Sequence, residues 1–311
     1  MRKCLAICLI FLGFSVSAVK ANTYDIAVSF PGTVEFFSIQ KKGMDAAARA
    51  HDVKLIYADA EWDPGKQFSQ IENFIARGVD AILLCPSDGQ ALRPVAQMAA
   101  EAKIPLITFT NPLGADPEGQ YPGVVTFIGN NEVKLGKMLG DMAEQLLGDQ
   151  PAKIVLIEGT PGTPPQRMRS KGFRDVVATH PNWEIVYSQG VTGWTKEGAL
   201  AVMEAVLQTG KEFNLVATQW HAAASATVVA LEEAQVERPI FVTSLELSKA
   251  LVPAIQQGKV HATTNYSIYD AGVLTIDTAV KYLEGHKVPN FIELNTIVVD
   301  KNNVDSVPAE L

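Results

Sequence analysis

Short apolar segments alternate with segments of helical periodicity along almost the whole chain, and this alternation limits the fold more than any other feature. The apolar segments have no polar face, which is typical of parallel strands covered by helices on both sides. The alternation therefore predicts a doubly wound α/β architecture. Strands are expected at residues 24–30, 53–58, 81–85, 105–109, 124–128, 153–158, 184–188, 215–218, 240–243 and 260–264. Helices are expected at residues 35–51, 65–77, 89–102, 132–147, 165–179, 195–208, 222–234, 249–257 and 270–283.

The number of strand–helix units predicts two sheets rather than one. An open sheet usually has about six strands, and some ten are expected here. The stretch 110–123, rich in Asn, Pro and Gly, is the expected crossing between the sheets. A single (βα)8 barrel is the alternative, since it needs about eight units and about 250 residues. Two domains are favoured because the connection 110–123 has no helical pattern.

The N-terminal segment has the pattern of a secretory signal peptide. Arg2 and Lys3 precede an uncharged apolar run at residues 4–19. That run is short for a membrane span, which needs about 20 residues. Val19-Lys20-Ala21 fits a cleavage site with small residues at both ends, and Val16-Ser17-Ala18 is the second possibility. We therefore expect residues 1–21 to be removed on export to the periplasm.

Charge and cysteine content narrow the classes of function. The formal net charge is −8, and removal of the three basic residues of the signal segment would take it to −11. An acidic chain without a basic stripe is a poor partner for nucleic acid. Cys4 and Cys8 lie within the expected signal peptide. Cys85 closes an apolar run, so we interpret it as a buried hydrophobic residue rather than a nucleophile.

The sequence has no recognisable catalytic motif. A Walker-type phosphate loop and a Gly-x-Ser-x-Gly nucleophile elbow are both missing. We interpret Gly159-Thr160-Pro161-Gly162 as a plain strand–helix turn. The histidines stand far apart, without the spacing of metal ligands. We expect neither an enzyme nor a cofactor nor a metal site; His221, next to a strand end, is a minor candidate for a binding site.

Polar and aromatic residues gather at the carboxyl ends of the expected strands, where ligands bind in open parallel sheets. Aromatic rings pack against the C–H faces of sugars, while amides and charged groups bind hydroxyls at the edge. This combination predicts a small, neutral, polyhydroxylated ligand. The candidate binding residues are Ser29, Glu35, Phe36, Phe37, Thr110, Asn111, Arg167, Trp194, Gln219, Trp220, Glu246, Asn265 and Tyr266.

Several stretches of the chain together resemble one known family. They are residues 26–37, 76–82, 104–108, 129–131, 167–173 and 254–258. They resemble the periplasmic sugar-binding proteins of the ribose- and galactose-binding type, relatives of the Lac repressor core, over about residues 25–304. The resemblance implies two Rossmann-like lobes joined by a three-stranded hinge that closes on the ligand. It places residues 22–129 plus 267–295 in the N-terminal lobe and residues 130–266 plus 296–311 in the C-terminal lobe.

The resemblance also implies roles for single residues. Phe36-Phe37 would supply ring contacts, and Arg167 would hold the ligand hydroxyls. Thr110-Asn111 replace the Asp-Arg pair of the ribose binders, which removes charge-assisted hydrogen bonds of about 1.5–3 kcal/mol each. Gln219-Trp220 replace a usual Asn-Asp and add a ring. We therefore expect a sugar derivative, a polyol or another hydroxylated metabolite rather than free ribose.

The family also implies partners. We expect a monomer that delivers its ligand to an ABC permease of the inner membrane. A receptor of the same fold that signals to a chemoreceptor or sensor kinase is the alternative. The missing catalytic motifs disfavour a periplasmic hydrolase. A transcription factor of the Lac repressor type is disfavoured because an export signal stands in place of a DNA-binding helix-turn-helix.

Overall fold

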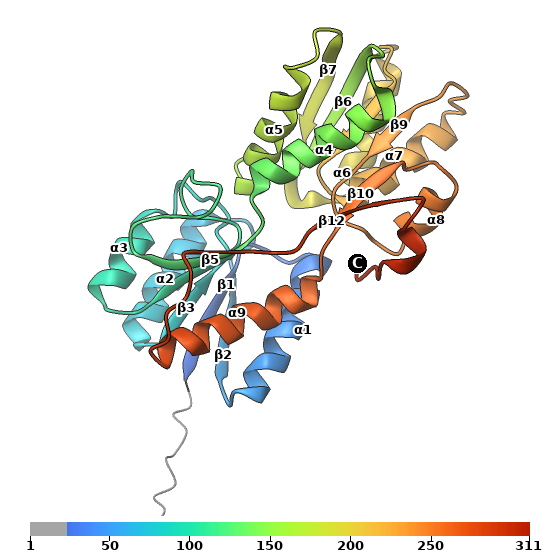
Figure 1. Ribbon diagram of the computed structural model, residues 1–311. Helices are drawn as coiled ribbons and strands as arrows, with labels where there is room; N and C mark the ends of the chain where they lie inside the picture. Colours follow the sequence, from blue (N-terminus) through green and yellow to red (C-terminus); the bar gives the residue numbers. More distant parts are fainter. Residues whose placement is uncertain (1–23) are drawn as a thin grey trace, which may run out of the picture.

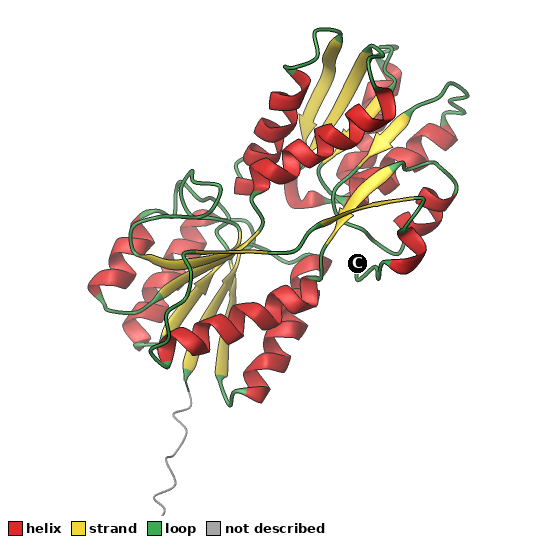
Figure 2. Ribbon diagram, in the orientation of Figure 1, coloured by secondary structure: helices red, strands yellow, loops and turns green. Residues whose placement is uncertain are grey.

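The computed structural model describes residues 24–311, which form two α/β lobes (Figures 1 and 2). The predicted signal peptide and its cleavage site lie outside the described residues. The first lobe has strands β1 (Asp25–Phe30), β2 (Lys54–Asp59), β3 (Ala81–Leu84), β4 (Leu106–Thr110), β5 (Val124–Gly129) and β11 (Phe291–Glu293). Its helices are α1 (Glu35–Ala50), α2 (Pro64–Arg77), α3 (Pro94–Glu101) and α9 (Ile268–Leu283).

The second lobe repeats this plan. Its strands are β6 (Ala152–Glu158), β7 (Trp183–Gly190), β8 (Leu215–Thr218), β9 (Phe241–Thr243), β10 (Ala262–Asn265) and β12 (Ile297–Asp300). Its helices are α4 (Glu132–Leu147), α5 (Pro164–Val177), α6 (Lys196–Gln208), α7 (His221–Glu233) and α8 (Leu251–Gln256), with 3-10 turns η1 (Thr192–Trp194) and η2 (Val304–Ser306). Among the described residues no helix is long and apolar enough to cross a membrane.

The two sheets share one strand order. The first runs β11-β5-β4-β3-β1-β2 and the second β12-β10-β9-β8-β6-β7. The described pairs are parallel except for β10 with β12. In each lobe the central strands are fully buried, as in Ala81–Leu84 of β3 and Leu215–Thr218 of β8, because helices cover both faces of the sheet. The prediction of two doubly wound lobes is confirmed, and Cys85 is buried.

Two features of the fold differ from the sequence prediction. Residues 110–123 do not cross between the lobes, because β4 and β5 are neighbours in one sheet. The sequence shows a long connection without a helix, but not which strand its end will pair with. The short strands β11 and β12 were not predicted. They have three and four residues at sheet edges and are mostly half-buried or exposed, so they lack an apolar signature.

The chain passes between the lobes three times, between β5 and α4, between β10 and α9, and between β11 and β12 (Figure 1). The passages contact one another. The amide of Leu294 donates to the carbonyl of Gly129 at 3.0 Å, and Thr296 donates to the side chain of Asn130 at 2.8 Å. Asn265 pairs with Ile297 in the β10–β12 ladder. These bonds tie the three passages into one connecting element.

Glycines allow one very close helix contact in each lobe. A Cβ on Gly136 of α4 would lie 2.1 Å from the carbonyl oxygen of Arg169 on α5, and one on Gly172 would lie 2.0 Å from that of Val133. The same arrangement joins α1 to α9, where a Cβ on Gly43 would lie 2.0 Å from the carbonyl oxygen of Tyr269. The α4–α5 contact fixes the backbone that carries Arg169.

Candidate functional site: a cavity between the lobes

A cavity of about 330 Å³ opens between the two lobes. This volume suits a small-molecule ligand. The first lobe lines it with Thr33, Val34, Glu35, Phe36, Phe37, Trp62, Thr110 and Asn111. The second lobe contributes Pro165, Arg169, Gly193, Trp194, Thr195, Glu197, Trp220, His221, Ala222 and Glu246, and Tyr266 follows β10.

The lining residues come from the ends of the sheets where the strands finish. They follow β1, β2 and β4 in the first lobe and β6 to β10 in the second. Both sheets reverse their strand order beside their first strand, β1 or β6. In open α/β sheets a crevice forms at this switch point, outside the carboxyl ends of the strands. The cavity is therefore where the topology predicts a ligand site, with half of its wall on each lobe.

Most of the predicted site residues line this cavity. They are Glu35, Phe36, Phe37, Thr110, Asn111, Trp194, Trp220, Glu246 and Tyr266, and the minor candidate His221 joins them. Four others do not line it. The side chains of Ser29 and Gln219 are buried in hydrogen bonds to Gln67 and to the amide of Gly159, and Asn265 donates to the carbonyl of Pro308.

Arg167 is the fourth predicted residue that the structure does not bring to the cavity. It donates to the carbonyl of Gly162, and its Nη1 lies 3.9 Å from Oδ1 of Asp88 on the other lobe. Arg169, two positions further along α5, lines the cavity instead. Two residues along a helix turn the side chain by about 200°, so the two arginines point in nearly opposite directions.

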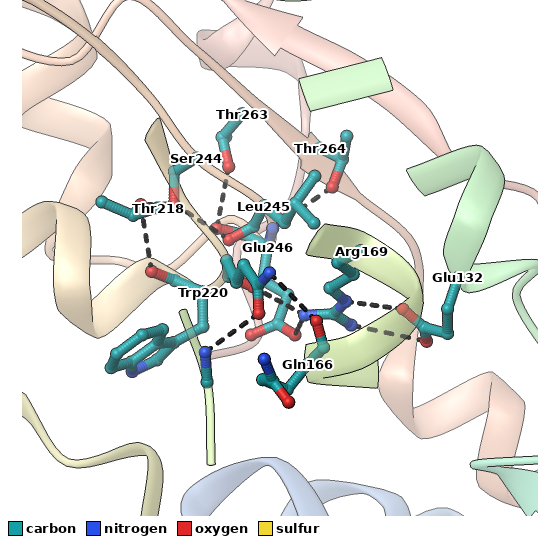
Figure 3. Close-up of polar contacts among 12 residues, drawn as sticks. Glu132, Gln166, Arg169, Thr218, Trp220, Ser244, Leu245, Glu246, Thr263 and Thr264 are labelled. Atoms are coloured by element: carbon teal, nitrogen blue, oxygen red, sulfur yellow. Dashed lines mark hydrogen bonds and ion pairs between the residues drawn. The ribbon is translucent and has the colours of Figure 1, made fainter. Parts of the chain in front are cut away.

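Arg169 is buried between two carboxylates (Figure 3). Its Nε lies 2.5 Å from Oε2 of Glu132, and its Nη1 lies 3.3 Å from Oε1 of Glu246 and 2.6 Å from the carbonyl oxygen of Gln219. Burial raises the pKa of both glutamates, and the guanidinium only partly opposes this. At this point the cavity wall therefore carries the guanidinium of Arg169, which the protein itself binds, and the carboxylate of Glu246, whose charge that guanidinium only partly neutralises.

Two tryptophans occupy equivalent places in the two lobes. Trp62 follows the second strand of the first lobe, and Trp194 follows the second strand of the other. Each indole lies against a glycine that follows the first strand of its lobe: a Cβ on Gly32 would lie 2.3 Å from Nε1 of Trp62, and one on Gly159 would lie 1.9 Å from the ring of Trp194. The cavity thus has one indole in equivalent positions on each lobe, and Trp220 adds a third from the second lobe.

Backbone strain gathers at the cavity. Eight non-glycine residues of the described chain have positive φ, and four of them line it: Trp62 (64°), Thr110 (59°), Trp194 (55°) and Glu246 (69°). Such conformations cost about 1–3 kcal/mol each, and they cluster at functional sites where surrounding structure holds them. Thr110 is the last residue of β4, and the other three follow the end of a strand. The left-handed backbone therefore directs three of the lining side chains, those of Trp62, Trp194 and Glu246.

Residues 26–287 match the family model described as periplasmic binding protein domain. The chain belongs to the periplasmic binding protein family. Members of this family are solute-binding proteins rather than enzymes, and they are periplasmic. Among the described residues no group of His, Cys, Asp and Glu could hold a metal ion.

This periplasmic binding protein has curated relatives of nearly the same length. It is 28% identical over 295 residues to a ribose import binding protein of Haemophilus influenzae, covering 94% of this chain and 96% of the relative. It is 31% identical over 277 residues to a putative rhizopine-binding protein of Rhizobium meliloti, with 87% of each covered.

Solved structures share the whole fold. An ABC transporter solute-binding protein of Bacillus halodurans with bound myo-inositol aligns at TM-score 0.84 and 24% identity, covering 92% of this chain and 98% of that one. The arabinose transporter component of Shewanella, bound to L-arabinofuranose, aligns at 0.81 and 26%, covering 91% and 93%. The fold is that of ABC transporter solute-binding proteins of type I.

Glu158, at the end of β6, fastens the helix that carries Arg169. Its carboxylate accepts hydrogen bonds from Gln166 (2.5 Å), Ser170 (2.6 Å), Arg174 (3.0 Å) and Ser188. Burial raises the pKa of Glu158, but the four hydrogen bonds outweigh burial, so the pKa lies below its ordinary value. Three of the four donors belong to α5, so the carboxylate joins that helix to the sheet.

This network predicts a pH dependence of stability. A carboxyl whose folded-state pKa is depressed stabilises the fold above its unfolded pKa, near 4.3, and this contribution is lost as the pH falls through the folded-state pKa. Glu158→Gln should lower the free energy of unfolding by about 1–3 kcal/mol at pH 7 and flatten its decline below about pH 4. Urea unfolding at several pH values measures both. Glu184→Gln on β7, where the carboxylate is exposed, is the control; equal behaviour of the two variants would contradict the prediction.

Proposed function

We propose that this protein captures a small sugar derivative or polyol in the cavity between its lobes and delivers it to an ABC permease. The observation that carries the proposal is the division of the cavity wall between the lobes. Phe36, Phe37 and Trp62 belong to the first lobe. Arg169, Trp194 and Glu246 belong to the second lobe. Only closure brings all of these groups to one ligand, so a ligand that binds both lobes shifts the open–closed equilibrium toward the closed form.

The chemistry of the wall supports this ligand class. Aromatic faces cover the C–H faces of a sugar or cyclic polyol, while Glu246, Asn111 and Tyr266 offer polar groups to its hydroxyls. The relatives named for ribose import and the solved structure with bound L-arabinofuranose support the same class. Their import function favours a permease as the partner over a chemoreceptor or sensor kinase.

The remaining parts of the proposal concern export and lobe boundaries. We propose that residues 1–21 are an export signal, which the basic start, the apolar run and Val19-Lys20-Ala21 support. We propose lobes of residues 22–129 plus 267–295 and 130–266 plus 296–311, which the membership of the strands in the two sheets supports. We also propose that the protein acts as a monomer, as the resemblance to periplasmic sugar-binding proteins implies.

Calorimetric titration with a panel of neutral sugars and polyols tests the proposed function. The panel should include myo-inositol, D-ribose, L-arabinose, D-galactose and D-glucitol, each in large excess. We expect at least one to bind, with a decrease in the radius of gyration by X-ray scattering when it saturates the protein. Absence of binding across this panel and across the aminated compounds described below, together with unchanged scattering, would overturn the proposal.

A further inference from the structure

Negative charge exceeds positive charge around the cavity. Glu35, Glu197 and Glu246 line it, and Arg169 is the one arginine or lysine among its lining residues in the described chain. His221 also lines it, but burial lowers the pKa of His221 to about 4, so this imidazole is neutral at pH 7. Three carboxylates therefore face the ligand space against one guanidinium.

The charge of that guanidinium is already engaged by the protein. Nε and Nη2 of Arg169 are directed to the two oxygens of Glu132 at 2.5 and 3.5 Å, and Nη1 serves the carbonyl of Gln219 and Oε1 of Glu246. Glu132 stands outside the cavity lining and is 2% exposed. Its contact with Nε is far shorter than that of Glu246 with Nη1, so Arg169 neutralises Glu132 first and leaves Glu246 in excess (Figure 3).

Glu246 has one oxygen available to a ligand. Its side chain is 13% exposed and lines the cavity, and among the described residues the only donor to its carboxylate is Arg169, at Oε1. Oε2 is therefore an acceptor without a donor. A buried carboxylate in excess of its cations is costly, and a cation placed beside it removes that cost.

The aromatic lining also favours a cation. Trp62 lines the cavity on the first lobe, and no cation of the described residues lies over its ring. On the second lobe the guanidinium of Arg169 already lies over the ring of Trp194, 5.7 Å from its centroid, and Trp220 lies edge-on to Trp194 at 5.4 Å between ring centroids. The faces of indole rings attract ammonium groups by about 0.5–2 kcal/mol, most strongly where water is excluded. A neutral polyol would satisfy the rings and some acceptors, but it would leave the excess charge uncompensated.

We propose that the ligand is a polyhydroxylated molecule that carries a protonated amine, with its ammonium group beside Oε2 of Glu246. This inference rests on the proposed function and names the chemical class within it. Hydroxyls of the ligand contact Asn111 and Tyr266, and Glu35 and Glu197 add negative potential at the rim. The same charges disfavour an anionic sugar phosphate or sugar acid.

Matched pairs of compounds that differ by one amine test the inference. We suggest myo-inositol against its monoamino-deoxy derivative, D-galactose against D-galactosamine, and D-glucitol against 1-amino-1-deoxy-D-glucitol, titrated by calorimetry at pH 7. We expect the aminated member of at least one pair to bind at least tenfold more tightly than its parent, which corresponds to about 1.4 kcal/mol.

Charge-removing variants locate the ammonium group. Glu246→Gln keeps the shape of the side chain and should remove most of the preference for the amine, while the affinity for the neutral parent changes less. Glu35→Gln, at the exposed rim, should reduce the preference for the amine by a smaller factor. If Glu246→Gln does not fold, Glu35→Gln still tests the inference. Glu233→Gln, an exposed carboxylate at the end of α7, is the matched control and should leave both affinities unchanged.

The outcomes separate the two proposals. Neutral compounds that bind as tightly as their aminated partners, or more tightly, would overturn this inference and leave the proposed function intact. A preference for the amine that survives in both Glu246→Gln and Glu35→Gln would overturn the placement of the ammonium group. Absence of binding by every compound would overturn the proposed function as well.

Discussion

Arg169→Met should destabilise the protein by about 3–5 kcal/mol and abolish ligand binding. The side chain of Arg169 is 6% exposed and lies between Glu132 and Glu246. Methionine fills much of the same volume but leaves both carboxylates buried without a cation. Breaking a buried ion pair from one side costs this much because the remaining charge has lost its compensation. Chemical unfolding and calorimetric titration measure the two effects.

The pH dependence of the variant identifies the cause. Burial already raises the pKa of Glu132 and Glu246, and loss of Arg169 removes the cation that opposes this rise. A carboxyl with a raised folded-state pKa favours the folded state below its unfolded pKa, and that advantage is lost as the pH rises through the folded-state value. The stability of Arg169→Met should therefore recover relative to the wild type as the pH falls from 7 toward 5.

Arg167→Met is the matched control on the same helix. Its guanidinium is partly exposed, and its contact with Asp88 is long, at 3.9 Å. Exposed pairs of this kind contribute about 0–1 kcal/mol, so we expect stability and affinity to change by no more than that. A loss of binding in Arg167→Met with retained binding in Arg169→Met would contradict the site described above.

The two arginines show how far the sequence could predict the site. The sequence predicts that both arginines lie on one helix that follows a strand, and the structure confirms this. To choose between them, one must know which face of the helix points toward the cavity. Buried residues of α5 include Pro165, Met168 and Gly172, spaced three and four apart, and Arg169 lies beside them on the buried face while Arg167 does not. The helical periodicity of buried residues therefore favours Arg169, although the resemblance to the sugar-binding family implied Arg167.

Other parts of the site could not be read from the sequence. Trp62 follows a predicted strand, yet nothing in its neighbourhood shows that a positive φ turns its ring toward the other lobe. The sequence predicts Glu132 only as the first residue of a helix, because its partner Arg169 lies 37 residues away along the chain. Contacts of this kind depend on how two chain segments meet, whereas the strand and helix pattern that gave the fold is local.

Gly159→Ala should lower ligand affinity about 10–30-fold, or 1.4–2 kcal/mol, while leaving the fold nearly as stable as before. A Cβ at this position would lie 1.9 Å from the ring of Trp194, far inside any real contact, so the indole must leave its place. The backbone amide of Gly159 still reaches Gln219, at 2.9 Å, because alanine keeps that donor. We therefore expect the loss of affinity to come only from displacement of the Trp194 ring.

Gly32→Ala tests the equivalent place in the first lobe, since its Cβ would lie 2.3 Å from Nε1 of Trp62. We expect a similar loss of affinity, because Trp62 and Trp194 line the cavity from equivalent positions on the two lobes. Gly65→Ala in α2, where the nearest atom is 3.2 Å away in the flexible side chain of Asp63, is the control. Combining Gly159→Ala with Trp194→Phe should cost little more than Trp194→Phe alone, because the smaller ring leaves room for the methyl group. Full additivity of the two changes, or wild-type affinity in Gly159→Ala, would show that Trp194 does not contact the ligand.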